Sequence, residues 1–341
     1  MKHKQHIKQA IAGILACAVI GSNALPAASQ FPALFPLAVT ASAASCCSLN
    51  ASTGVLTLSG NVDWSTVRSY ANNAKVKSVV CKSGTVFPAD SYGLFGDFRA
   101  TTMDLSNANV RNVTNMRAMF SGCTQLTSIN LNNFVTGSCT DMAAMFKNCY
   151  KLTSLDLRSF STALVKDMSY MFDDCSNLQS IKLNSFNTAS CKNMSNMFRD
   201  CSKLVTLRTW SWNTSNVTNM SGMFMGCKAL RNFYVEFTNT SHVTDMSNMF
   251  KMCEALTFLD LTDFNTSSVT NTISMFERCT ALKTIYATNS FTTANVPNLK
   301  SLSMFSNCPK LVGGNGTHVT DTYKTYARID KPGQKGYFTQ G

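Results

Sequence analysis

Cysteine is the residue type in this sequence with the most chemistry open to it, because the 341 residues include 14 cysteines. Eight of them recur at regular spacing: Cys123, Cys149, Cys175, Cys201, Cys227, Cys253, Cys279 and Cys308. In an exported protein such thiols could form disulfides, and clustered thiols could hold zinc. However, each lies on an apolar stripe, and equivalent positions in stacked repeats point the same way, a poor geometry for a bridge. We therefore predict buried free thiols that fill the core, and extend this to Cys139 and Cys191, which occupy an inward Val position.

Other reactive groups give little support for catalysis. Beyond the first residues, the histidines are His242 and His318, and neither has an evident partner in the sequence. No Gly-rich phosphate loop follows a strand pattern, and no Ser or Cys stands in a nucleophile context. Cys46, Cys47 and Cys81 remain open to disulfide pairing. We expect a protein that is not an enzyme, with no catalytic residue, no cofactor and no metal.

A repeated Met-Phe pair defines the architecture that positions these residues. Its phenylalanine recurs every 26 residues at Phe120, Phe146, Phe172, Phe198, Phe224, Phe250 and Phe276. An eighth, Phe305, follows 29 residues later, and Phe95 precedes the series by 25. A constant period in this range indicates a solenoid, in which stacking buries the apolar side that one repeat cannot bury alone.

Each repeat predicts one short helix and one short strand. The stripe of one repeat consists of Met168, Met171, Phe172 and Cys175. These residues stand at i, i+3, i+4 and i+7, the spacing of an apolar helix face, and Asp167 stands at the N-cap position. Ile181 and Leu183 then alternate as in a strand. The predicted fold class is an α/β repeat solenoid, a leucine-rich-repeat-like stack of a short helix and a short parallel strand per 26-residue repeat, with N- and C-terminal caps.

Four segments follow from this pattern: a signal peptide at 1–43, an N-terminal cap at 44–92, the repeats at 93–311 and a C-terminal cap at 312–341. In the first cap, Leu56–Leu58 and Val76–Val80 predict strands, and Trp64 predicts a helix. In the second, Gly313–Gly316 interrupts the repeat pattern and a polar tail rich in Tyr follows.

The first segment has the features of an export signal. A basic start, Met1–Lys8, precedes the apolar stretch Ala10–Ile20 and small residues suited to cleavage. We favour cleavage after Ala43, because the folded pattern starts near Cys46. The alternatives are cleavage after Ala24 and a lipoprotein cut before Cys17.

Composition limits the location and the partners. No other stretch approaches the ~20 apolar residues of a membrane-spanning helix, so we expect no span in the mature chain and an extracellular protein, secreted or on the cell surface. We also expect a monomer. The formal charge is +12, and +9 without Lys2, Lys4 and Lys8. A positive surface favours acidic partners such as cell-wall glycans. The basic residues are scattered along the sequence, which argues against nucleic acid.

The repeats resemble those of the BspA-like leucine-rich surface proteins of bacteria, as the unit Asn216–Cys227 illustrates. The segments Leu311–Thr317, Tyr326–Asp330 and Gly336–Thr339 resemble the closing part of that family, and Gly84–Asp90 resembles the approach to its first repeat. The resemblance implies a secreted or cell-surface bacterial protein for adhesion or binding to host proteins. It carries over no catalytic residue.

Differences between the repeats indicate where a partner could bind. If the strands line one face, the residues eight and ten after each repeat Phe point to solvent there. Early repeats have small polar residues at these positions, whereas later repeats have Lys182, Arg208, Tyr234, Phe258 and Tyr286. Aromatic and basic side chains are frequent anchors of interfaces, so we take these five as a binding strip for an extracellular protein or glycoprotein. Two alternatives stay open: a solvated face without a partner, and an envelope component that binds cell-wall glycan through its basic surface.

Overall fold

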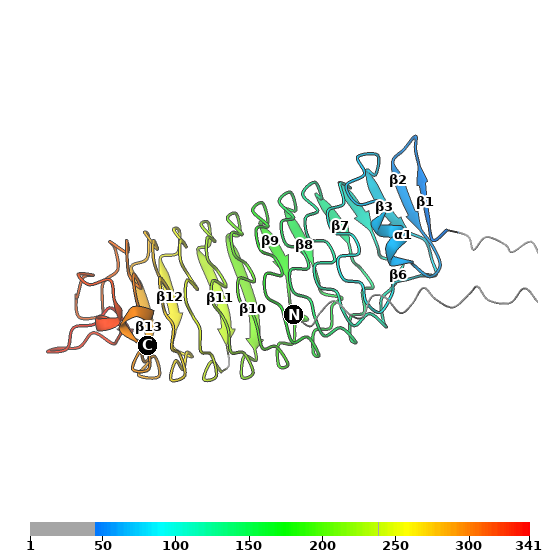
Figure 1. Ribbon diagram of the computed structural model, residues 1–341. Coiled ribbons are helices and arrows are strands. Elements are labelled where there is room, and N and C mark those ends of the chain that lie inside the picture. The colour runs from blue at the N-terminus through cyan, green and yellow to red at the C-terminus, as the bar shows by residue number, and fades with distance from the viewer. Residues whose placement is uncertain (1–44, 238) are drawn as a thin grey trace, which may run out of the picture. The chain divides into compact units, whose positions relative to one another are not determined.

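The computed structural model describes residues 45–237 and 239–341, and residues 45–341 form one unit. In this unit the chain winds into a β-solenoid of about 9 turns, here called coils, each of which adds a short strand to the same side (Figure 1). The predicted signal peptide lies outside the described residues.

The strands are two to seven residues long. They are β1 (Cys47–Asn50), β2 (Val55–Leu58), β3 (Ser78–Cys81), β4 (Thr85–Val86), β5 (Thr102–Asp104), β6 (Ala108–Asn109), β7 (Ser128–Asn130), β8 (Ser154–Asp156), β9 (Ser180–Lys182), β10 (Thr206–Trp212), β11 (Asn232–Phe237), β12 (Phe258–Leu261), β13 (Thr284–Ala287) and β14 (Thr339–Gln340). Among them, β4 and β6 form a small sheet separate from that of β3 and β5. The helices are α1 (Trp64–Arg68) and the 3-10 turns η1 (Asn298–Lys300) and η2 (Lys324–Tyr326). The strands predicted near Leu56 and Val79 and the helix at Trp64 are therefore present.

Parallel pairing of successive coils confirms the predicted solenoid. β1 pairs with β2 in antiparallel fashion at the N-terminal end. From β2 onward the recorded pairs are parallel and in register with the repeat, as in Leu155 opposite Ile181 and Leu259 opposite Ile285. Equivalent residues of neighbouring repeats therefore lie side by side.

The predicted helix in each repeat is wrong. Within the described residues, α1 near the N-terminus is the α-helix of the chain, and the Met-Phe segments are runs of turns. In the repeat of Phe172, the residues two before and two after it have positive φ, 57° at Tyr170 and 58° at Asp174. Residues in this left-handed region cannot continue a right-handed helix, so each segment folds into successive tight turns.

Backbone hydrogen bonds explain how these turns are stabilised. The amide of Phe172 donates to the carbonyl of Met197 in the next coil at 2.9 Å, whereas the preceding amide, of Met171, donates back to Met168 at 3.3 Å. Equivalent bonds recur in the other repeats. About half of the amides in a segment therefore depend on the neighbouring coil, and a segment alone could not satisfy them.

The apolar stripe faces the core as predicted, although it does not lie on a helix. Met168, Met171, Phe172 and Cys175 are fully buried. The repeat phenylalanines stack along the solenoid, with ring centroids 5.9 Å apart between Phe146 and Phe172. The Asp167 carboxylate accepts a hydrogen bond from the Ser169 amide at 2.8 Å. It thus stabilises an Asx turn where the sequence predicted a helix cap.

The cysteines are core residues. The 13 cysteines of the described part are buried free thiols. Among those left open to pairing, Cys46 and Cys47 have their sulfur atoms 3.5 Å apart. Burial raises the pKa of Cys81, and also that of Cys123, to about 12, so these groups are poor nucleophiles at neutral pH. Of the described helices, none has the length and apolar character needed to cross a membrane.

Candidate partner-binding surface

The five residues of the predicted binding strip lie on five successive strands, β9 to β13. Strand alternation exposes Phe258 on β12 and Tyr286 on β13, which are 42% and 37% exposed, while Leu259 and Ile285 beside them are buried. Lys182 and Arg208 are also exposed. Tyr234 lies on β11, and its side chain is outside the described part of the chain.

Lys182, at one end of the strip, belongs to an ion cluster. Its ammonium group lies 3.2 Å from the Asp156 carboxylate, which Arg158 also contacts at 2.7 Å. Hydrogen bonds from Arg158, with a smaller contribution from Lys182, hold the pKa of the Asp156 carboxyl well below its usual range. The charge of Lys182 is therefore partly neutralised within the protein, and this residue is a weaker anchor than its exposure suggests.

The structure brings the strip together only in part. Arg208 lies opposite Tyr234 in the pairing of β10 with β11, and Asp260 lies opposite Tyr286 in the pairing of β12 with β13. Phe258 lies opposite Thr284, two positions before Tyr286. Among the described strands, no hydrogen-bonded pairing joins β9 to β10 or β11 to β12. The strip thus consists of three neighbouring groups. They are Lys182 on β9, Arg208 with Tyr234 on β10 and β11, and Phe258 with Tyr286 on β12 and β13.

A hollow of about 290 Å³ between the β11 and β12 coils was not predicted from the sequence. Its lining is Phe233, Glu236, Phe237, Phe258, Asp260, Asp263 and Phe264. Three carboxylates beside the exposed ring of Phe258 suit a cationic side chain, because ring faces and carboxylates both attract positive charge; the other three rings are buried. The sequence does contain a signal for this hollow, namely acidic residues near the ends of two neighbouring strands. Glu236 stands twelve residues after Phe224, and Asp263 stands thirteen residues after Phe250.

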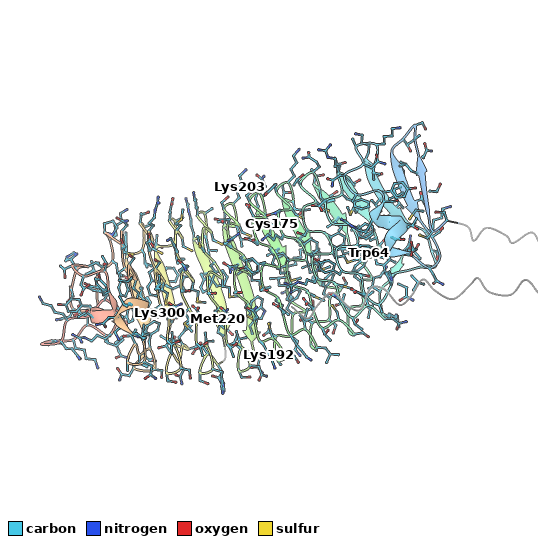
Figure 2. All side chains as sticks on the ribbon, viewed as in Figure 1. Trp64, Cys175, Lys192, Lys203, Met220 and Lys300 are labelled. Atoms are coloured by element: carbon cyan, nitrogen blue, oxygen red, sulfur yellow. The ribbon has the colours of Figure 1, made fainter. Side chains whose placement is uncertain are left out.

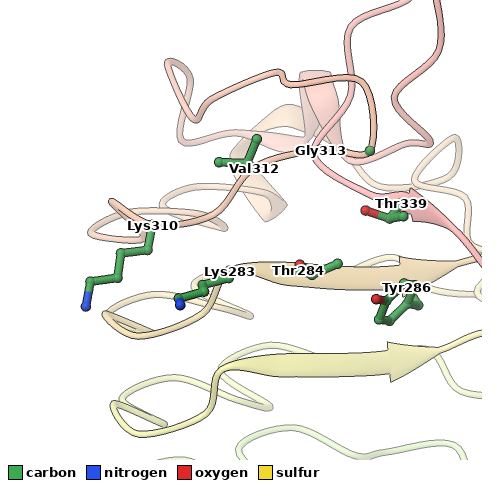
Figure 3. Close-up of a pocket in the computed structure, with 8 residues that line it drawn as sticks. Lys283, Thr284, Tyr286, Lys310, Val312, Gly313 and Thr339 are labelled. Atoms are coloured by element: carbon green, nitrogen blue, oxygen red, sulfur yellow. The ribbon is translucent and has the colours of Figure 1, made fainter.

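A second and more open hollow, of about 560 Å³, lies between β13 and the C-terminal segment (Figure 3). Lys283, Thr284, Tyr286, Lys310, Val312, Gly313, Gly314 and Thr339 line it. Figure 3 shows Lys283 and Lys310 near one end of β13, and Tyr286 and Thr339 near the other. β14 pairs with the second half of β13, placing Thr339 opposite Tyr286.

Metal chemistry has no framework in the part of the chain that the structure describes. There, His, Cys, Asp and Glu side chains do not gather in groups of three that could hold an ion. The side chains of the strip and of the two hollows can form hydrogen bonds, ion pairs and aromatic contacts.

Solved structures with some similarity include leucine-rich repeat proteins of bacteria. One from Bacteroides ovatus is 16% identical with a TM-score of 0.39, and the match covers 72% of this chain and 68% of that chain. One from T. pallidum, TpLRR, is 18% identical with a TM-score of 0.33, covering 62% and 86%. One from Eubacterium ventriosum is 15% identical with a TM-score of 0.26, covering 86% and 90%. No curated protein matches the sequence.

A protein-family comparison is more informative than these structures. Residues 89–210 and 205–314 each match the family described as "Mycoplasma protein of unknown function, DUF285". The matched segments span the repeats and cover more than half of the 341 residues. The chain therefore belongs to the DUF285 family.

Proposed function

We propose that this protein is a non-catalytic interaction module that binds a protein or glycoprotein partner across strands β9 to β13. The observation that carries the proposal is the pair of aromatic side chains Phe258 and Tyr286, exposed on adjacent strands whose alternate residues Leu259 and Ile285 are fixed in the core. Exposed aromatic groups on a rigid support are typical interface anchors, because binding immobilises little that was mobile before.

The surroundings of these rings support the same function. Phe258 forms part of the acidic hollow, and Tyr286 forms part of the basic one. A partner lying across β12 and β13 could therefore bury aromatic surface and place charged groups in both hollows. Solenoids commonly bind through such extended faces, which stacked repeats present at regular intervals.

We further propose an extracellular setting, in which the protein is secreted or held at the cell surface as a monomer. The signal-like segment 1–43 and the resemblance to BspA-like surface proteins support this location. The partner would then be an extracellular protein or glycoprotein, for example of a host, and the role would be adhesion.

Binding of the purified protein to a panel of extracellular proteins and cell-wall fractions, measured by surface plasmon resonance, would test the proposal. The variant Arg208→Ala/Tyr234→Ala/Phe258→Ala should lower affinity for the identified partner at least tenfold. Its thermal unfolding midpoint should equal that of the wild type. A matched control away from strands β9 to β13, Arg111→Ala/Tyr92→Ala/Leu164→Ala, removes one arginine, one tyrosine and one large apolar residue that are all exposed. Equal affinity of the two triple variants would refute the proposed surface.

A further inference from the structure

The solenoid gathers basic side chains along one long edge, where the chain enters its strands. These residues stand four, five or seven positions after the repeat Phe and are here called the basic edge: Lys151, Lys203, Lys228, Arg231, Lys283 and Lys310. All six are exposed. Among the residues four, five and seven positions after each repeat Phe, from Phe146 onward, the one acidic residue is Glu254. Residues that are scattered in sequence thus form a line, because the period brings each one to the same edge.

The edge where the chain leaves the strands differs in charge. Its positions ten, twelve and thirteen after the repeat Phe carry the basic residues Arg158, Lys182 and Arg208 and the acidic residues Asp156, Glu236, Asp260 and Asp263. At these positions the basic edge, with Glu254 included, has a formal charge of +5, whereas the other edge is nearly neutral at −1. Polyanions would therefore be attracted more strongly to the basic edge than to the other.

The partners of two lysines leave their charge available. Lys151 donates to the side-chain oxygen of Gln125 at 2.7 Å, and Lys203 donates to that of Asn177 at 2.6 Å. Both partners are neutral, whereas Lys182 on the other edge contacts a carboxylate. These hydrogen bonds hold the two ammonium groups along the edge without neutralising them.

The basic edge ends at the C-terminal hollow of about 560 Å³. Lys283 and Lys310 contribute positive charge there, Thr284 and Thr339 contribute hydroxyl groups, and Tyr286 contributes an exposed ring (Figure 3). An apolar ring face beside hydroxyl and ammonium donors suits a hydroxylated ring that has an apolar C–H face and an acidic group, which is the chemistry of a uronic acid or sulfated sugar unit.

We propose that the basic edge binds a linear acidic glycan and that the C-terminal hollow takes one of its acidic sugar units. Coils at the spacing of parallel strands, ~4.8 Å, place the charges of the edge one or two coils apart, about 5–10 Å. Acidic polysaccharides repeat a carboxylate or sulfate every one or two sugar rings, on the same length scale. This activity goes beyond binding of a protein partner. It shares Tyr286 and the C-terminal hollow with the surface proposed for that partner, and the other residues of the basic edge lie outside that surface.

The test uses the purified protein and a fluorescein-labelled hyaluronate oligosaccharide, followed by fluorescence anisotropy. Binding should be measurable at low salt and weaken at least tenfold between about 50 and 300 mM salt, because exposed charges are screened. The variant Lys203→Gln/Lys283→Gln/Lys310→Gln should bind at least tenfold more weakly. The control Lys166→Gln/Lys192→Gln/Lys300→Gln removes three charges elsewhere and should stay within twofold of wild type. Figure 2 shows Lys203 and Lys192 at opposite edges of the solenoid.

Further arms distinguish a glycan from other polyanions. Tyr286→Ala should weaken hyaluronate at least fivefold and leave polyglutamate unchanged, since only the sugar has a ring to contact. The strip variant Arg208→Ala/Tyr234→Ala/Phe258→Ala should keep hyaluronate binding, so this test and that of the protein partner can fail separately. The proposal is overturned by absent binding at low salt, by equal losses in both lysine triples, or by an equal effect of Tyr286→Ala on polyglutamate.

Discussion

The thiol of Cys175 donates a hydrogen bond to the backbone carbonyl of Phe146 in the preceding coil, with 3.1 Å between sulfur and oxygen. The contact recurs at the other repeat cysteines, as between Cys201 and Phe172, also at 3.1 Å. Each thiol is thus a second donor to its carbonyl, because the Phe146 carbonyl also accepts from the amide of Cys149, at 3.2 Å. A buried thiol of this kind serves the stack as a neutral donor and loses that role when it ionises.

Alkaline pH should accordingly unfold the protein. Burial raises the pKa of Cys139 to about 11 and that of Cys308 to about 12, while the thiols of the unfolded chain have a pKa of ~8.5. Above ~8.5 the unfolded chain loses protons that the folded chain keeps, so the free energy of unfolding falls as pH rises, by about 1.4 kcal/mol per pH unit for each thiol. Urea unfolding under reducing conditions at pH 7.5, 8.5 and 9.5 measures this. A midpoint that stays constant up to pH 9.5 would contradict it.

Replacing Ala144 by Gly should stabilise the protein. Ala144 has φ of 56°, where an alanine is strained and glycine is not, so we expect a gain of about 0.5–1 kcal/mol. In a helix the same substitution would cost about 1 kcal/mol. The sign of the change in the free energy of unfolding therefore distinguishes a left-handed turn from a helix at this position. The neighbouring Ala143→Gly is the control, because Ala143 is buried and is not among the residues with positive φ; it should be destabilising. Thermal or urea unfolding of both variants provides the comparison.

Phe172→Ala should cost about 3–5 kcal/mol in the free energy of unfolding. The ring is fully buried, and its centroid lies 5.9 and 5.2 Å from those of Phe146 and Phe198. Removing it leaves a cavity that the adjacent coils cannot close without breaking their register. Phe258→Ala removes the same side chain from an exposed position and should change stability by less than about 1 kcal/mol. Similar losses for both variants would be inconsistent with the placement of these rings.

Asp173 should be far more important for stability than Asp156. Its fully buried carboxylate lies 3.1 Å from the Lys147 ammonium and 2.6 Å from the Arg199 guanidinium. Asp173→Ala would leave two partly buried cations without an anion, at a cost of about 3 kcal/mol. The pairs of Asp156 with Arg158 and Lys182 are more exposed, so Asp156→Ala should cost about 1 kcal/mol or less. Urea unfolding at low and at moderate salt should show a larger loss in the free energy of unfolding for Asp173→Ala than for Asp156→Ala. A smaller loss for Asp173→Ala would count against this arrangement.

Much of the architecture follows from the sequence alone. The 26-residue period, the parallel strands and the inward stripe of Met171, Phe172 and Cys175 depend on which residues are apolar and how regularly they recur. Those features survive any local conformation that keeps the stripe on one side, so they could be predicted without knowing the backbone.

The tertiary structure decided what depends on a neighbouring coil. The stripe spacing fits both a helix and a run of tight turns, and the turns form because amides such as that of Phe172 find acceptors in the next coil. For the same reason the hollows beside Phe258 and Tyr286, and the alignment of Lys203 with Lys283 along one edge, follow only from the stack. Residues 26 or more positions apart in the sequence become neighbours there, and their contacts have no local signal in either repeat.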